Sequence, residues 1–263
     1  MEIQNITKPY RIGLALSGGG IKGLCHAGAI KALEEYGVKP HVISGVSAGS
    51  IVGALYADGY SPDEIGDFFH KVSFREMASL EMSGGLFNIN EFEKFLKKKL
   101  RAETFEELQI PLRIVATNLD NGHCVTFSQG KLLEKIIASC SLPVLFSPKK
   151  IDNVNYVDGG VLKNFPASTI REECDILIGI NASPMIAKEY KRGIKNVAMR
   201  SYHFMMKSNI LHDKEVCDIL IEPTDMGNYD TFDLGKSNEI FEVGYTSTKL
   251  IIEEANFFPA KSN

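Results

Sequence analysis

The chain has 263 residues, of which 44% are hydrophobic and 24% charged, and these values are ordinary for a globular protein. Its formal net charge of −4 gives no reason to expect a nucleic-acid partner. No window reaches the ~18 uninterrupted apolar residues of a membrane helix, and the N-terminal MEIQNITKPYR lacks the apolar core of a secretory signal. We therefore expect no transmembrane segment and a cytoplasmic location, with any membrane contact peripheral.

The first part of the chain contains two successive strand–helix units. Residues 10–16 form a short apolar run that predicts a buried strand, and 21–37 carry apolar residues at helical spacing. A second strand is predicted at 41–46, followed by a helix rich in small residues at 48–59. Residues 61–64, Ser-Pro-Asp-Glu, have the composition of a helix start, with serine as N-cap and proline at the first helical position.

The same alternation continues to the C-terminus. We predict a hairpin at 111–128 with its turn at Asp120-Asn121-Gly122, and a second at 149–160 with its turn at Asp152-Asn153. Further helices are predicted at 90–100, 131–142, 187–211 and 235–255, and further strands at 174–181 and 217–223. Residues 77–90 have the least regular pattern. Strands alternating with helices indicate an α/β fold with a mostly parallel sheet, which we treat as one domain over residues 1–263.

Five cysteines are dispersed along the chain without a CxxC pair or a metal-like spacing to histidine: Cys25, Cys124, Cys140, Cys174 and Cys217. An odd, scattered set is typical of buried thiols in a reducing compartment. We expect neither a metal nor a cofactor.

A glycine loop, Gly18-Gly19-Gly20, stands between the first strand and the first helix. Together with Gly23 it satisfies G-x-G-x-x-G, but a dinucleotide site needs an acidic residue after the second strand, and none lies between Glu35 and Asp58. A second reading is an oxyanion hole, because glycines allow close backbone approach and the first N–H groups of a helix lack internal partners. A third is a tight turn that only permits close packing.

The segment Gly45-Val46-Ser47-Ala48-Gly49 has the G-x-S-x-G form of a nucleophile elbow, with Ser47 between a strand and a helix. If the first two strands are parallel neighbours, the glycine loop and Ser47 lie at the same edge of the sheet, where α/β proteins bind ligands.

Such a serine usually needs a histidine, and the chain has six. The order Ser47, Asp158, His203 is that of α/β-hydrolases, but in that fold the nucleophile follows several strands, whereas here it follows the second. His26, one turn past the glycine loop, fits a packed core residue better.

A carboxylate is the other candidate base. Asp158-Gly159-Gly160 follows a predicted strand, although Asp-Gly is also a common turn pair.

The glycine loop, the serine elbow and Asp158-Gly159-Gly160, in this order, resemble the patatin-like phospholipase family over roughly residues 11–181. The resemblance implies a three-layer α/β/α fold and a serine acyl hydrolase with a Ser-Asp dyad. Ser47 would be the nucleophile, Asp158 the base, and the main chain of Gly18, Gly19 and Gly20 the oxyanion hole. Five further glycines would support these motifs: Gly23, Gly45, Gly49, Gly159 and Gly160. Many relatives carry arginine where this chain has Lys22, which offers a point charge in place of a bidentate fork.

The resemblance implies an acyl lipid as substrate, met at a membrane or micelle surface. Residues of 77–90 (Leu80, Met82, Leu86 and Phe87) and Leu142, Val144 and Phe146 are candidates for an apolar groove. Residues 188–207 carry six basic residues against one acid, which favours either an anionic lipid surface or a solvated helix face. The alternatives are a serine esterase or thioesterase with a Ser-His-Asp triad, and a catalytically silent lipid-binding module on the same fold.

Overall fold

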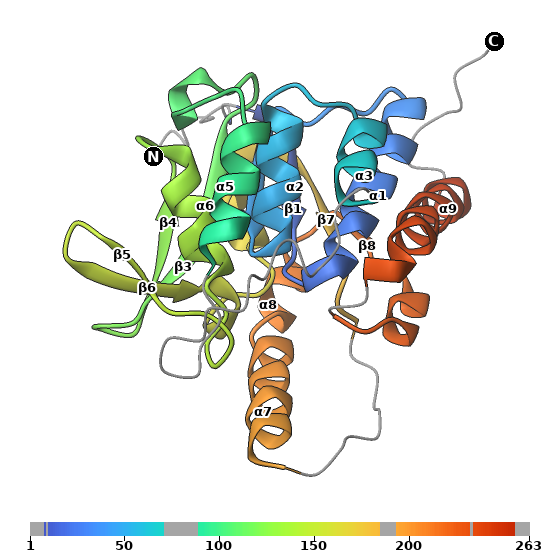
Figure 1. Cartoon of the computed structure of the whole chain (residues 1–263). Coiled ribbons are helices and arrows are strands. Elements are labelled where there is room, and N and C mark those ends of the chain that lie inside the picture. The colour runs from blue at the N-terminus through green and yellow to red at the C-terminus, as the bar shows by residue number, and fades with distance from the viewer. Residues whose placement is uncertain (1–7, 9, 71–88, 185–192, 232–233, 256–263) are drawn as a thin grey trace, which may run out of the picture.

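The computed structural model describes residues 8, 10–70, 89–184, 193–231 and 234–255 (Figure 1). These residues form an eight-stranded sheet. Its strands are β1 Tyr10–Leu16, β2 Val42–Val46, β3 Leu112–Asn118, β4 His123–Phe127, β5 Lys149–Ile151, β6 Val154–Asp158, β7 Cys174–Ile180 and β8 Ile219–Ile221. The order is β5-β6-β3-β2-β1-β7-β8, with β4 also paired to β3.

The sheet is mixed and mostly parallel, as the sequence predicts. Strands β3, β2, β1, β7 and β8 run parallel to one another, and the predicted hairpins supply the antiparallel pairs β3–β4 and β5–β6. Asp152 and Asn153 form the second hairpin's turn with φ of 47° and 66°. Positive φ at both central residues matches the right-handed twist of the flanking strands, and Asp and Asn tolerate it better than most residues.

The helices are α1 Leu24–Glu35, α2 Ala48–Ala57, α3 Pro62–His70, α5 Asn90–Lys99, α6 Leu132–Cys140, α7 Ile194–Ser208, α8 Leu211–Glu215 and α9 Ser237–Ala255. The start of α3 is a capping box: the Ser61 N–H donates to Glu64 Oε2 at 2.8 Å, and the Glu64 N–H donates to Ser61 Oγ at 3.3 Å. Gly37, with φ 75°, follows α1 and ends it.

Two predicted helices differ from those observed. The helix predicted at 21–37 begins with a 3₁₀ turn, Gly20–Gly23, before α1. The helix predicted at 187–211 is divided into α7 and α8, and residues 185–192 lie outside the described chain. The division falls at Asn209, whose side-chain amide donates to the carbonyls of Gly160 and Val161, and at Ile210, which is 1% exposed. Tertiary contacts therefore override a continuous helical pattern here.

The two faces of the sheet are covered unequally. One face carries Leu14, Ile43 and Ile178, which belong to the larger core together with buried side chains of the main helices. The other face carries the residues next to these in sequence, Ala15, Val42 and Leu177. They belong to a smaller core, which is closed by Phe165, Ile170 and Ile210. The second outer layer thus consists of short 3₁₀ turns and the α7–α8 junction. In the part of the chain described, no helix has both the length and the apolarity to cross a bilayer.

Candidate active site

Ser47 occupies a sharp bend between β2 and α2. Its φ of 51° and ψ of −123° are unusual for a residue with a side chain and mark a strained backbone. The bend requires the flanking glycines: a Cβ on Gly49 would lie 2.3 Å from the Leu16 carbonyl oxygen, and one on Gly45 would lie 2.5 Å from the Gly49 carbonyl oxygen. Close backbone packing therefore explains why glycines stand on both sides of Ser47 in the G-x-S-x-G pattern.

A second serine holds this bend in place. The Ser47 N–H donates to Ser139 Oγ at 2.8 Å, and Ser139 Oγ donates to the Val115 carbonyl at 2.6 Å. Ser139 is fully buried on α6. The Ser47 carbonyl accepts a 2.6 Å hydrogen bond from Ser50 Oγ. Both backbone polar groups of Ser47 are satisfied, so the bend is rigid. No sequence pattern indicated the role of Ser139.

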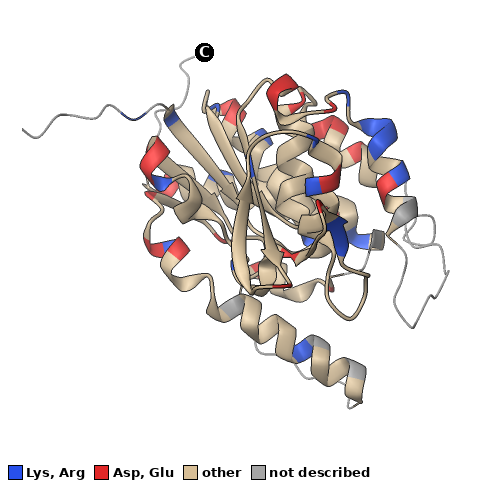
Figure 2. Cartoon of the chain, turned by 90° about the vertical axis from the view of Figure 1, so that its left-hand side faces the viewer, with Lys and Arg blue, Asp and Glu red and all other residues tan. Residues whose placement is uncertain are grey.

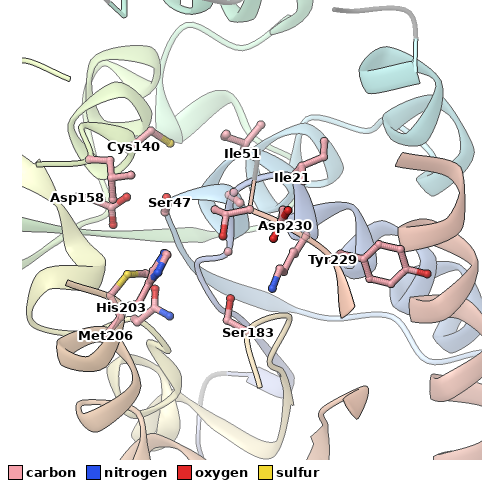
Figure 3. A pocket seen from close by; sticks show the side chains of 18 of the residues that line it. Ile21, Ser47, Ile51, Cys140, Asp158, Ser183, His203, Met206, Tyr229 and Asp230 are labelled. Atoms are coloured by element: carbon pink, nitrogen blue, oxygen red, sulfur yellow. The ribbon is translucent and has the colours of Figure 1, made fainter. Parts of the chain in front are cut away.

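Strand register brings Asp158 to Ser47. Val46 pairs with Val115, and Asp158 pairs with the next residue of β3, Ala116. Strand β4 occupies the other edge of β3 over the same residues, so β2 and β6 share one edge and meet with their carboxyl ends facing each other. The residue that follows Val46 is Ser47, which therefore lies beside the end of β6 (Figure 3).

The Asp158 carboxylate is buried beside Ser47. It is 1% exposed, accepts the Gly160 N–H at 2.7 Å, and lies close enough to the Ser47 side chain for that side chain to affect its pKa. Burial raises the pKa of the Asp158 carboxyl to about 6, although the Ser47 side chain and the Gly160 N–H act in the opposite direction. This carboxylate is consequently a stronger base than an exposed aspartate, and it is still mostly ionised at neutral pH.

The glycine loop packs against the elbow, and its three amides differ. A Cβ on Gly18 would lie 3.3 Å from Ser47 Cβ, but the Gly18 N–H already donates to the Asn164 carbonyl at 3.0 Å. The N–H groups of Gly19 and Gly20 have no hydrogen-bond partner among the described residues. Gly20 has φ 61°, and a Cβ there would lie 2.4 Å from the Thr231 carbonyl oxygen. Of the three predicted donors, Gly18 is engaged elsewhere and Gly19 and Gly20 are available.

The N–H of Ala48, in the first turn of α2, is also unpartnered within the described chain. In α/β-hydrolases the residue after the nucleophile donates to the oxyanion from this position. The N-terminus of α2 therefore offers a further candidate donor to the oxyanion, in addition to the predicted glycine loop.

The remaining predicted glycines allow other close approaches around the site. A Cβ on Gly23 would meet Ala48 Cβ at 2.5 Å, and one on Gly159 would meet the Val115 carbonyl oxygen at 2.4 Å. A Cβ on Gly160 would lie 2.8 Å from Asn164 Oδ1. Larger side chains would separate the glycine loop, the elbow and the Asp158 turn.

Ser47 and Asp158 line a pocket of about 350 Å³ (Figure 3). Much of its wall is apolar and comes from the large hydrophobic residues Ile51, Phe69, Phe92, Leu142 and Phe146. Lys22 also lines it. Among the predicted groove residues, Leu142 and Phe146 are in the wall, whereas Val144 is 44% exposed. Leu80, Met82, Leu86 and Phe87 lie outside the described residues.

Several residues of the pocket were missed from sequence. Asn164 is 1% exposed, and its Oδ1 has no hydrogen-bond partner among the described residues. Tyr202 of α7 is 7% exposed, and its hydroxyl also has no hydrogen-bond partner among the described residues. The pKa of this hydroxyl is raised, mainly by burial and to a smaller extent by the nearby charge of Asp158. No motif distinguishes Asn164, and the periodicity of 188–207 indicated only a surface helix.

Two histidines bear on the question of a triad. His26 is fully buried with Nε2 at 2.8 Å from the Ser17 carbonyl oxygen, and burial lowers its pKa to about 4. It is a core residue, as its position one turn past the glycine loop indicated. His203 lines the pocket from α7 (Figure 3).

Comparison with known proteins defines the family. The family model for patatin-like phospholipases matches residues 14–170. YqhO of Bacillus subtilis is 31% identical over 68% of this chain and 74% of its own length. The lysophospholipase NTE1 of Kluyveromyces lactis is 30% identical over 89% of this chain. The chain belongs to the patatin-like phospholipase family.

A solved structure supports the fold independently. VipD from Legionella pneumophila superposes with a TM-score of 0.63 over 94% of this chain and 67% of its own, at 16% sequence identity. The match to NTE1 spans only 18% of that protein, so the chain corresponds to one part of a much longer relative.

Proposed function

We propose that this protein is a lipid acyl hydrolase of the phospholipase A or lysophospholipase type, which cleaves carboxylic ester bonds through an acyl-Ser47 intermediate. The observation that carries the proposal is the juxtaposition of Ser47 and a buried Asp158 in one largely apolar pocket, bordered by main-chain amides that have no partner among the described residues. Family membership supports a lipid substrate.

In the acylation step, Asp158 accepts the Ser47 hydroxyl proton while Oγ forms a bond to the ester carbonyl carbon. The negative charge on the former carbonyl oxygen is stabilised by the N–H groups of Gly19, Gly20 and Ala48. One such donor is worth roughly 3–4 kcal/mol of transition-state stabilisation in other hydrolases. When the tetrahedral intermediate collapses, the bond to the leaving alcohol breaks and protonated Asp158 returns the proton to that alcohol oxygen.

In the deacylation step, Asp158 accepts a proton from water while the water oxygen attacks the acyl-Ser47 carbonyl carbon. Collapse of the second tetrahedral intermediate breaks the bond to Oγ, the proton returns to Ser47, and the free fatty acid leaves. The raised pKa of Asp158 assists both steps, because general catalysis is most efficient when the pKa of the base lies near the working pH.

An acyl chain is the group that this pocket suits best. Ile51, Phe69, Phe92 and Phe146 offer apolar contact beside Ser47. A polar headgroup would have to lie toward the part of the wall that contains Lys22 and Arg200.

The test is labelling with a fluorophosphonate probe, followed by mass spectrometry of products from a mixed lipid extract. Wild-type protein should be labelled at Ser47 and should release free fatty acid, whereas Ser47→Ala should do neither. Ser44→Ala is the matched control: Ser44 is a buried serine on β2, three residues before Ser47, and its hydroxyl contacts Thr169 Oγ1 at 2.7 Å. It should keep labelling and activity. A folded wild-type protein that is not labelled would instead be a silent lipid-binding module.

A further inference from the structure

Helix α7 extends away from the body of the molecule (Figures 1 and 2). It carries an exposed apolar stripe. Ile194 is 92% exposed, Val197 48%, Phe204 54% and Met205 49%. Their positions i, i+3, i+10 and i+11 place all four on one face of the helix. Single exposed apolar residues are common, but four aligned along one projecting helix form an apolar surface of the kind that marks an interaction site.

The adjacent face of α7 belongs to the pocket. Tyr202 and Met206 are 7% and 8% exposed and line the cavity that holds Ser47 and Asp158. Phe204 contributes to both surfaces, because it lines the pocket and is 54% exposed. The exposed stripe is therefore continuous with the wall of the pocket.

The charge of the helix is opposite to that of the chain as a whole. In the sequence, the α7 segment contains Lys195, Arg200 and Lys207 and no acidic residue, whereas the whole chain has a formal net charge of −4. An apolar stripe on a basic helix is typical of elements that lie in the interface of an anionic membrane.

We propose that α7 docks on anionic lipid surfaces by inserting Ile194, Val197, Phe204 and Met205 among the acyl chains, which places the mouth of the pocket on the membrane. Docking would help catalysis by bringing lipid substrate to the pocket, and this benefit rests on the proposed function. The docking itself does not depend on the proposed function. A lipid occupant fits better than a second protein copy because the basic charge of the helix would repel its own counterpart, whereas it attracts an acidic lipid headgroup.

The test is co-sedimentation of the full chain in the Ser47→Ala background, so that hydrolysis cannot alter the vesicles. The vesicles contain phosphatidylcholine alone or with about 30% phosphatidylglycerol. We expect tighter binding to the anionic vesicles, and a loss of at least about tenfold in the combined variant Ile194→Ser, Val197→Ser and Met205→Ser. Equal binding to both kinds of vesicle, or unchanged binding by the combined variant, would overturn the proposal.

The matched control is Leu250→Ser, which removes an equally exposed leucine (54%) from α9. It should bind vesicles as the parent does, and equal losses in both variants would contradict a specific role for α7. With Ser47 restored, the combined variant should hydrolyse a soluble short-chain ester within about twofold of wild type. Absence of that activity in wild type as well would refute the proposed function without affecting docking. If sedimentation velocity shows a dimer that the combined variant dissociates, a second copy covers the stripe and the lipid proposal fails.

Discussion

Replacing Asp158 by asparagine should make the protein more stable at neutral pH while it removes the proposed catalytic base. The carboxylate is ionised in a buried site, and this costs folding free energy that a neutral amide of the same shape does not. Asparagine Oδ1 can still accept the Gly160 N–H, which Asp158 holds at 2.7 Å.

The size of the effect follows from the pKa. In the folded chain the pKa of Asp158 is about 6, against an ordinary value of 3.8. Each pKa unit corresponds to ~1.4 kcal/mol, so ionised Asp158 destabilises the fold by up to about 3 kcal/mol at pH 7. Because the folded pKa is the higher one, stability is greatest below pH ~4, where Asp158 is protonated in both states, and decreases as the pH rises through about 6.

The assay is urea unfolding of wild type and Asp158→Asn at pH 4 and pH 7. The variant should be about 1–3 kcal/mol more stable at pH 7, and the difference should nearly disappear at pH 4. Asp213→Asn is the control, since Asp213 is also 1% exposed but contacts Lys163 at 2.8 Å. It should destabilise, because it removes the buried carboxylate that pairs with the Lys163 ammonium and leaves that ammonium only its hydrogen bond to Ser168 Oγ. An Asp158→Asn variant that is less stable than wild type at pH 7, or a difference independent of pH, would refute the reasoning.

Three further predictions concern activity and the elbow. The kcat/KM for a soluble ester should rise as the pH increases through about 6 and then level off, because only ionised Asp158 can accept the proton of the Ser47 hydroxyl. A kcat/KM that falls across that range would contradict the role of Asp158 as the base. Ser139→Ala should cost about 1–3 kcal/mol in urea unfolding and lower kcat more than it changes KM, because it leaves the part-buried N–H of Ser47 without its Ser139 acceptor. Unchanged stability would argue against this anchor. His203→Gln and His26→Gln should each retain activity within about tenfold in initial-rate assays, whereas a folded histidine variant as inactive as Ser47→Ala would replace the dyad with a triad.

Much of the local structure could be predicted from the sequence, because it depends on short-range sterics and hydrogen bonds. The capping box at Ser61 and Glu64, the hairpin turn at Asp152 and Asn153 and the strand–turn–helix around Ser47 each follow from the residues themselves. The mostly parallel sheet followed from alternating patterns, and the family from three short motifs in order.

Other features depend on contacts between distant segments, which no local pattern encodes. The anchoring of Ser47 by Ser139 and the use of the Gly18 amide by Asn164 are set by tertiary packing. The break between α7 and α8 likewise arises where Asn209 bonds to the turn after Asp158.

The sequence by itself determined that a hydroxyl, a carboxylate and a glycine loop stand at the ends of strands, since strand ends and glycine turns are local properties. Only the tertiary structure decided that β2 and β6 meet along one edge of β3, which brings the hydroxyl and the carboxylate together in one pocket. It also decided that the carboxylate is buried, which raises its pKa, and that α7 has one face in the pocket and one face exposed. Register and burial are long-range properties, because they depend on which segments pack together.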